Sequence, residues 1–353
     1  MGDEDVAALL PALLHTLESL GFVGRHLNPL HLADLIEAVG APDQALQAAR
    51  EHLGSATAPS DTRSRLAAAR VAALAAFAGL RAASDNEQGI LAAYQALRQV
   101  PRAHEVLYPL AATVPAISSF FLDPAIRDDA ALQARVALPA RSGETGVIHV
   151  DNDPGTRGGF SLYVPEYYDD SRAWPLVVAL HGGSGNGRAF LWSWLRDARS
   201  RGAILASPTA TGRTWALLGD DTDTPNLMRM LAFVRERWRI DPARMLLTGM
   251  SDGGTFAFVS GLQSGSPFTH LGPVAAAFHP LLLEFADADR VLGLPIYLVH
   301  GALDWMFPVQ VARTAQRALS AAGARVTYRE IDDLSHCYPR EVNAAMLAWL
   351  ATA

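Results

Sequence analysis

The stretch that decides the fold runs from Met245 to Gly254 and reads MLLTGMSDGG. Residues Met245 to Thr248 predict a strand, and the residues from Gly253 onward predict a helix. Between them lies a Gly-x-Ser-x-Gly pattern, which places a serine on a strained strand-to-helix turn when this context is present. The flanking glycines let the backbone bend without a side-chain clash. Ser251 is therefore the candidate nucleophile; the alternative is an idle serine in a glycine-rich turn.

Strand and helix patterns alternate on both sides of this turn. The run LVVAL at 176–180 is continuously apolar, as expected of a strand buried on both faces. Alternation of this kind predicts an α/β fold with a mostly parallel sheet flanked by helices. The expected strands are 146–150, 159–164, 176–180, 203–206, 245–248, 274–278, 296–299 and 326–331. The expected helices are 189–201, 226–239, 253–262, 309–322 and 341–350.

The first part of the chain has a different texture. Leu9, Leu13 and Leu17 belong to one apolar helical face, and further amphipathic segments follow up to about Ala134. A polar, glycine-containing junction at 141–146 separates this part from the strand-rich part. We therefore expect two domains, a helical domain at 1–138 and a catalytic domain at 139–353. The helical domain is interpreted as a lid, a structural support or a dimerisation surface.

A nucleophilic serine needs a base, and the base needs an acid that orients it. On this kind of turn the chain order is Ser, then Asp or Glu, then His. Asp304 follows the strand expected at 296–299, and His336 is the last histidine of the chain. Reactive groups in parallel sheets lie at the carboxyl ends of strands, which favours Asp304 as the acid and His336 as the base. The weaker candidates for the acid lie in an expected helix and are Glu284, Asp287 and Asp289.

Acyl transfer also needs amide donors aimed at the developing oxyanion. The segment HGGSG at 181–185 follows the buried strand, where this kind of site supplies one backbone N–H. We expect the donors to be the amides of Gly183 and of Asp252, the residue after the nucleophile. A phosphate-cradling loop is the alternative, but the glycine spacing fits neither a dinucleotide motif nor a P-loop. His181 is expected to hold this loop together.

Several aromatic residues fall on loops that should border the site. Trp305 directly follows Asp304, Trp192 follows the glycine-rich loop, and Trp215 follows the strand expected at 203–206. His279 follows another expected strand. Aromatic walls fit an apolar acyl or alcohol group, so we expect these four residues to contact substrate. The alternative for each of them is a packing role in the core.

Composition excludes other classes of function. The chain has 353 residues, 50% hydrophobic and 18% charged, with a net charge of −7 and no basic run, which argues against a nucleic-acid partner. Cys337 is the one cysteine and lysine is absent, so intrachain disulfides, cysteine zinc clusters and lysine Schiff bases are excluded. No metal or cofactor is expected. The apolar run at 71–80 is shorter than the ~20 residues of a membrane span, and no signal peptide is evident, so a cytoplasmic location is expected.

These motifs together resemble the α/β-hydrolase superfamily. The HGG loop, the Gly-Met-Ser-Asp-Gly-Gly turn, the segment HGALD with the residues up to Pro308, and the loop at His336 carry the resemblance. They are most similar to the phospholipase/carboxylesterase group, near polyhydroxybutyrate-depolymerase-like esterases and dienelactone hydrolases. The resemblance covers about residues 140–353 and implies a triad of Ser251, His336 and Asp304. The helical N-terminal region departs from the single-domain form of this group. The resemblance therefore does not predict how substrate reaches the pocket.

The function expected from these features is that of a serine carboxylesterase acting through an acyl-enzyme. Its substrate would be a small-molecule or polymeric ester. A thioesterase or a serine peptidase on the same fold is the alternative, although peptidases of the prolyl-oligopeptidase type carry a β-propeller in place of helices. A non-catalytic binding protein is disfavoured because such relatives usually lack a triad member. A homodimer is compatible with the sequence.

Overall fold

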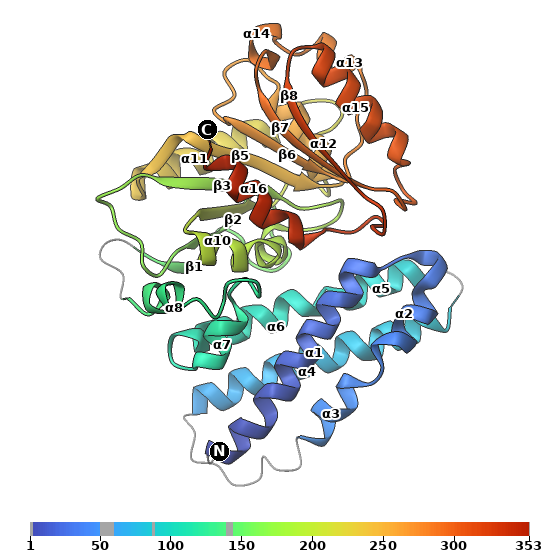
Figure 1. The fold of residues 1–353 in the computed structure, drawn as a ribbon, viewed down its shortest axis with the longest axis vertical. Coiled ribbons are helices and arrows are strands. Elements are labelled where there is room, and N and C mark those ends of the chain that lie inside the picture. Colours follow the sequence, from blue (N-terminus) through green and yellow to red (C-terminus); the bar gives the residue numbers. More distant parts are fainter. Residues whose placement is uncertain (1–2, 50–59, 87–88, 139–143, 353) are drawn as a thin grey trace. The chain divides into compact units, whose positions relative to one another are not determined.

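The computed structural model describes residues 3–49, 60–86, 89–138 and 144–352. The chain forms two compact units, residues 1–124 and 125–353 (Figure 1). Helix α8 (Ala130–Val136) groups with the second unit, although the sequence analysis placed it in the helical domain. Part of the expected junction at 141–146 lies outside the described residues, as does the expected boundary at 139.

The described part of the first unit is helical, as predicted. Leu13 of the longest apolar face is fully buried, and Leu9 and Leu17 are 1% and 2% exposed. Helices α4 and α5 approach so closely that a Cβ at Gly79 would lie 2.7 Å from the Cβ of Ala96, so small residues set this packing. The elements are α1 (Asp3–His26), η1 (Pro29–His31), α2 (Leu32–Val39), α3 (Pro42–Ala48), α4 (Ser60–Ser84), α5 (Gly89–Leu97), α6 (Gln99–Leu107), η2 (Tyr108–Ala112) and α7 (Pro115–Phe120).

Within the described residues, one helical stretch is long and apolar enough to cross a membrane by length and composition. It is Asp61–Ser84, and 44% of its most apolar window is buried inside the chain. The apolar run at 71–80 is only part of this helix, which begins at Ser60 and ends at Ser84. Core helices of soluble proteins meet the same criteria, so this helix is weak evidence for a span.

The second unit is built on one sheet, which confirms the predicted α/β fold class. Its eight strands have the order β1-β2-β4-β3-β5-β6-β7-β8. Strand β2 is antiparallel to β1 and β4, and the strands from β4 to β8 pair in parallel. The strands are β1 (Gly146–Val150), β2 (Phe160–Val164), β3 (Trp174–Leu180), β4 (Ile204–Pro208), β5 (Ile240–Met250), β6 (His270–Val274), β7 (Pro295–Gly301) and β8 (Arg325–Ile331).

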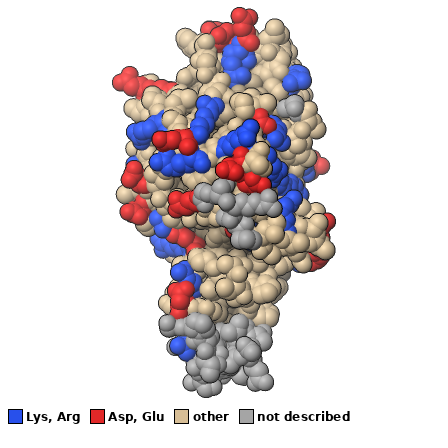
Figure 2. All heavy atoms as spheres, turned by 90° about the vertical axis from the view of Figure 1, so that its left-hand side faces the viewer, with Lys and Arg blue, Asp and Glu red and all other residues tan. Residues whose placement is uncertain are grey.

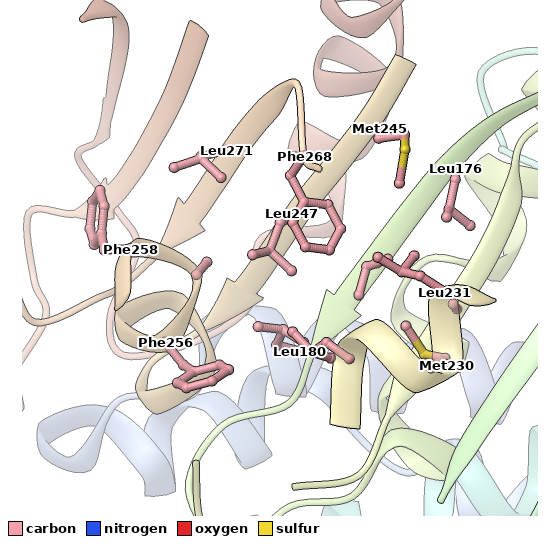
Figure 3. Close-up of a cluster of buried hydrophobic side chains, with 14 of the residues drawn as sticks. Leu176, Leu180, Met230, Leu231, Met245, Leu247, Phe256, Phe258, Phe268 and Leu271 are labelled. Atoms are coloured by element: carbon pink, nitrogen blue, oxygen red, sulfur yellow. The ribbon is translucent and has the colours of Figure 1, made fainter. Parts of the chain in front are cut away.

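Helices cover this sheet and bury its apolar side chains. Figure 3 shows Met230 and Leu231 of α11 pointing at Leu180 and Leu247 on the neighbouring strands β3 and β5. All four side chains are at most 2% exposed, which explains why these strands read as continuous apolar runs. The helices are α9 (Gly187–Phe190), η3 (Leu191–Ser193), α10 (Leu195–Arg201), α11 (Asp223–Arg237), α12 (Asp252–Gly261), α13 (Leu281–Glu284), α14 (Ala288–Val291), α15 (Val309–Ala321), η4 (Arg340–Val342) and α16 (Asn343–Leu350).

One predicted strand is wrong by several residues. The sequence analysis placed it at 274–278, but β6 runs from His270 to Val274 and ends there. The apolar run after Val274 looked like a buried strand, while Gly272 and Pro273 looked like strand breakers. In the sheet, Pro273 pairs with Gly249 in a parallel ladder, and Ala275 has a φ of 46°, which ends the strand.

Charged side chains of both signs are interspersed on the face of the molecule drawn in Figure 2. All the basic side chains on it are arginines, since the chain has no lysine. Elsewhere in the chain some arginines pair with nearby carboxylates, for example Arg65 with Asp61 at 2.8 Å on α4. Pairs at the surface contribute little to stability.

Candidate active site

The predicted turn forms between β5 and α12, and Ser251 stands at its apex. Its backbone has a φ of 55° and a ψ of −121°, a region that a residue with a side chain rarely adopts. Such a conformation costs about 1–3 kcal/mol and persists only where the surroundings enforce it. The Ser251 amide donates to the Val274 carbonyl at 2.9 Å, which ties the turn to the end of β6.

The glycines around Ser251 are required because backbone approaches backbone there. A Cβ at Gly249 would lie 2.6 Å from the carbonyl of Gly253. A Cβ at Gly253 would lie 2.4 Å from the carbonyl oxygen of His181 and 2.6 Å from that of Leu180. Real Cβ atoms essentially never approach a backbone atom so closely, so these positions accept only glycine without movement of the chain.

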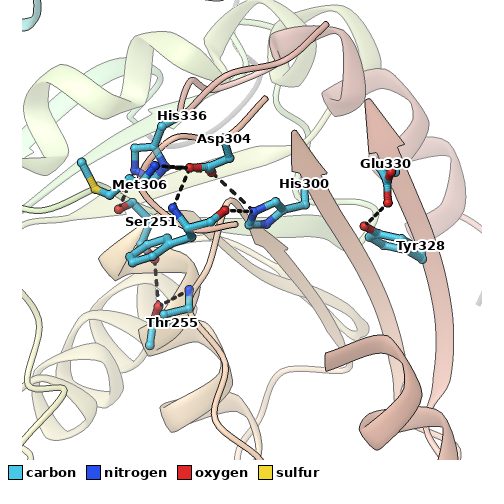
Figure 4. A network of polar contacts seen from close by, with 10 residues as sticks. Ser251, Thr255, His300, Asp304, Met306, Tyr328, Glu330 and His336 are labelled. Carbon is cyan, nitrogen blue, oxygen red and sulfur yellow. Dashed lines mark hydrogen bonds and ion pairs between the residues drawn. The ribbon is translucent and has the colours of Figure 1, made fainter. Parts of the chain in front are cut away.

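The three residues predicted for a triad lie together, although each comes from a different loop. His336 Nε2 is 3.0 Å from Ser251 Oγ (Figure 4). On the other side of the ring, His336 Nδ1 lies 2.9 Å from Asp304 Oδ2 and 3.1 Å from Asp304 Oδ1. The three residues are at most 7% exposed. The sheet produces this arrangement because β5, β7 and β8 are parallel and end at one edge.

The carboxylate of Asp304 is held by the turn that follows it. Its Oδ1 accepts from the Met306 amide at 2.9 Å and from the Phe307 amide at 2.8 Å. Burial alone raises the pKa of Asp304, but the hydrogen bond and charge of His336, with the Phe307 amide, lower it further than burial raises it. The pKa therefore lies below the ordinary 3.8, and Asp304 is ionised at neutral pH.

An ionised Asp304 fixes the tautomer of His336. A carboxylate only accepts hydrogen bonds, so His336 Nδ1 must carry a proton and donate it. In the neutral ring, Nε2 is then the acceptor, and it faces the hydroxyl of Ser251. The arrangement can therefore remove a proton from Ser251 and keep it on a ring stabilised by a negative charge.

The loop at 181–185 is held in place by the ring of His181. Its Nε2 accepts from the Ala210 amide at 3.1 Å, so its Nδ1 carries the proton and donates to the Gly182 carbonyl at 2.6 Å. Burial lowers the pKa of His181 to about 4, which keeps the ring neutral at pH 7. His181 is thus structural, as the sequence suggested.

The two amides expected to stabilise an oxyanion lie next to Ser251. The position a Cβ would take on Gly182 is 3.6 Å from Ser251 Cβ, which places the Gly182–Gly183 segment beside the nucleophile. Asp252 opens α12, and the first amides of a helix have no partner within it. In the described part of the chain, neither the Gly183 nor the Asp252 amide donates to a protein acceptor. Both donors are available to a bound group.

The side chain of Asp252 joins the start of α12 to the loop that contains Thr214. Its Oδ2 accepts from Thr214 Oγ1 at 2.5 Å, and the same oxygen lies 2.8 Å from where a Cβ on Gly183 would be. Gly183 is therefore the residue that leaves room for the carboxylate. Only the backbone amide of Asp252 was predicted from the sequence; this side-chain contact was not.

Two of the residues predicted to contact substrate are accessible. Trp305 is 41% exposed, and its ring centroid lies 6.4 Å from that of His336 in an edge-on arrangement. His279 is exposed, and its Nδ1 accepts from the Leu281 amide at 3.2 Å. Met306 is 42% exposed on the same turn as Trp305 and was not singled out from the sequence.

The structure places the other two predicted contacts in the interior. Trp215 is 2% exposed, donates to the His181 carbonyl at 2.7 Å and stacks on Phe256 at a centroid distance of 5.3 Å. Trp192 lies in η3 and is 3% exposed. Both residues are buried in the core, which was the alternative interpretation for each of them. Trp215 also holds the loop of His181 through its hydrogen bond to the His181 carbonyl.

Two polar contacts at the site went unrecognised in the sequence. Thr255, one turn into α12, donates to the Ser251 carbonyl at 3.2 Å and accepts from the Ala277 amide at 3.0 Å. His300 is fully buried at the end of β7, with its Nε2 3.5 Å from Asp304 Oδ2. The short spacing between His300 and Asp304 could have predicted this contact, since the two residues flank one tight turn. The acids considered as alternatives to Asp304 belong to α13 and α14, and Asp287 caps α14.

Comparison with known proteins agrees with this geometry. Residues 220–353 match the family model of phospholipases and carboxylesterases, a range that contains all three proposed catalytic residues. Over these residues the match agrees with the predicted resemblance to this α/β-hydrolase group. A search of curated proteins found no match.

Several solved structures are similar to part of the chain. A truncated carbohydrate esterase from gut microbiota is 14% identical, with a TM-score of 0.49 over 61% of this chain and 98% of its own. A fluorophosphonate-binding serine hydrolase from Staphylococcus aureus is 15% identical, with a TM-score of 0.47 over 59% and 99%. An S-formylglutathione hydrolase from Agrobacterium tumefaciens is 16% identical, with a TM-score of 0.46 over 61% and 99%.

Proposed function

We propose that this chain, whose residues 220–353 match phospholipases and carboxylesterases, is a serine carboxylesterase that works through an acyl-enzyme. The observation that carries the proposal is the unbroken hydrogen-bonded series Ser251–His336–Asp304 on a strained turn. Free amides at Gly183 and Asp252 beside that turn support it, because acyl transfer needs both a base-activated nucleophile and an oxyanion site.

In the first half of the reaction, Ser251 Oγ attacks the ester carbonyl carbon, and its proton passes to His336 Nε2. The carbonyl oxygen becomes an oxyanion that accepts hydrogen bonds from the amides of Gly183 and Asp252. Each such donor typically contributes about 3 kcal/mol to transition-state stabilisation. When the intermediate collapses, the bond to the alkoxy oxygen breaks and His336 returns its proton to the leaving alcohol. Asp304 keeps its charge throughout and stabilises the imidazolium.

In the second half, water takes the place of the alcohol. His336 removes a proton from the water as it attacks the acyl carbon bound to Ser251. The same two amides donate hydrogen bonds to the new oxyanion. Collapse breaks the bond to Ser251 Oγ, which regains a proton from His336, and the carboxylic acid leaves. The cycle needs no redox change, and all protons stay with Ser251, His336, water and the products.

The exposed side chains at this edge favour an apolar ester. Trp305 and Met306 are both large, apolar and more than 40% exposed, and the turn that bears them is fixed by the amides on Asp304. A side chain presented so close to His336 is positioned to contact the acyl or the alcohol group of a substrate. The accessible His279 follows β6, the strand whose end holds the Ser251 turn.

The test is hydrolysis of p-nitrophenyl esters from acetate to palmitate, with acyl thioesters of the same chain lengths run beside them. Wild type is compared with Ser251→Ala and with the matched control Ser260→Ala, a buried serine on the helix α12 that follows Ser251. We expect activity toward esters in wild type and in the control, and none in Ser251→Ala. Full activity in Ser251→Ala would remove the proposed nucleophile. Activity on thioesters alone would replace the esterase with a thioesterase that uses the same residues.

A further inference from the structure

His300 is a buried polar residue that the reaction described above does not use. It lies near the end of β7 and has no exposed surface. Its Nε2 is 2.8 Å from the Phe307 carbonyl oxygen and 3.5 Å from Asp304 Oδ2. Its Nδ1 has no hydrogen-bond partner among the residues that the structure describes. The ring thus meets both ends of the turn that carries the proposed catalytic acid.

The direction of the bond follows from the chemistry of the groups. A carbonyl oxygen only accepts, so His300 Nε2 carries a proton and donates it to Phe307. Phe307 precedes Pro308, whose nitrogen has no hydrogen, so the peptide between them can be anchored only through this carbonyl. His300, near the end of β7, anchors this carbonyl.

This anchor and the carboxylate of Asp304 hold the same residue from opposite sides. The Phe307 amide donates to Asp304 Oδ1 at 2.8 Å, while its carbonyl accepts from His300. The hydrogen bond between His300 and Phe307 therefore closes a ring of chain from residue 300 to 307, and the bond between Phe307 and Asp304 closes a smaller ring within it. Moving the Phe307 peptide would displace a donor from the carboxylate that orients His336.

We propose that His300 is a positioning residue for the reaction, which acts by fixing the Asp304 turn and thereby the angle and tautomer of His336. The inference rests on the proposed function. Burying a histidine with one unpaired nitrogen is unfavourable, whereas a leucine would fill the same space without that cost. A polar ring at this position is therefore explained by the hydrogen bond that it supplies.

The test compares three substitutions at one position. His300→Gln keeps a donor near the place of Nε2, His300→Leu fills the space without a donor, and His300→Asn is polar but too short to reach Phe307. The matched control is His270→Leu, since His270 is also buried and lies at the opposite end of the neighbouring strand β6. Each variant is measured for kcat, KM, the pH profile of kcat/KM and the fraction of Ser251 labelled by an alkyl phosphonate.

We expect His300→Leu and His300→Asn to lower kcat per labelled site by about 10- to 100-fold with little change in KM, the size of a small misplacement of a catalytic group. A loosened carboxylate stabilises the imidazolium less, so the acid limb of kcat/KM should move to lower pH. His300→Gln should restore both values. The charged groups that face His300 are Asp304 on its own turn and Glu330 on β8, and none of these substitutions alters them.

A merely structural histidine gives a different result. The proposal is overturned if kcat per labelled site and the acid limb stay at wild-type values in His300→Leu and His300→Asn. It is also overturned if His270→Leu changes them equally. If His300→Leu does not fold, His300→Asn and His300→Gln still separate the two outcomes. Activity that persists in Ser251→Ala would instead refute the proposed function, so the two failures are distinguishable.

Discussion

The substitution Asp304→Asn tests the geometry of the triad most finely, because it changes one atom at a known position. Two backbone amides, from Met306 and Phe307, donate to Oδ1 at 2.9 and 2.8 Å. The asparagine carbonyl must therefore take the place of Oδ1, since an amide nitrogen there would face two donors. The NH₂ group then takes the place of Oδ2, at 2.9 Å from His336 Nδ1.

A donor at that position reverses the tautomer of His336. His336 must now accept at Nδ1, so its proton moves to Nε2, which can no longer take the proton of Ser251. A wrong tautomer in a Ser-His-Asp triad lowers kcat by about 10⁴-fold. That factor corresponds to about 5 kcal/mol of transition-state stabilisation. The fold should survive, because the substitution keeps both amide hydrogen bonds and removes only a charge.

The assay is steady-state hydrolysis of a p-nitrophenyl ester by Asp304→Asn beside the matched control Asp221→Asn. Asp221 Oδ1 likewise accepts from two backbone amides, those of Asp223 at 3.2 Å and Thr224 at 2.9 Å, but Asp221 is not part of the triad. We expect the large loss only at position 304, with similar melting temperatures. A loss of less than about tenfold at position 304, or an equal loss at 221, would refute the reasoning.

Three further predictions follow from the same structure. Gly253→Ala should lower the melting temperature sharply or prevent soluble expression, since its Cβ would lie 2.4 Å from a backbone oxygen; normal thermal unfolding would contradict this. Trp305→Ala should raise KM for long-chain esters with kcat nearly unchanged, while the exposed Leu292→Ala, on the loop before β7, should change neither. Burial lowers the pKa of His270 from 6.5 to about 4, so the unfolded chain binds more protons between these values. Stability should therefore fall as pH drops from 6.5 to 4, and melting curves should show a shallower fall in His270→Leu.

Much of this fold could be predicted from the sequence because its strands are buried on both faces and separated by helices. The apolar runs of β3 and β7 were evident for that reason. Strand β6 was misplaced, since its Gly-Pro pair reads as a break unless the neighbouring ladder is known. The register of one strand is decided by its partners, which a local pattern does not contain.

The candidate site divides in the same way. Ser251, Asp304 and His336 could be predicted because a turn motif and the order of the three residues along the chain are both visible in short segments of sequence. Trp215 was taken for a substrate contact, but its nitrogen bonds the carbonyl of His181, a contact between two loops. The positioning contact of His300 was missed because one histidine before a glycine carries no distinct pattern.

The most direct test of the central claim is to locate the covalent bond. Wild type and Ser251→Ala are treated with an alkyl phosphonate ester, and the labelled peptide is identified by mass spectrometry. A single phosphonyl group on Ser251, formed in step with loss of esterase activity and absent from the variant, is the predicted result. Labelling of another residue with the same loss of activity, or full activity after complete labelling of Ser251, would contradict the account.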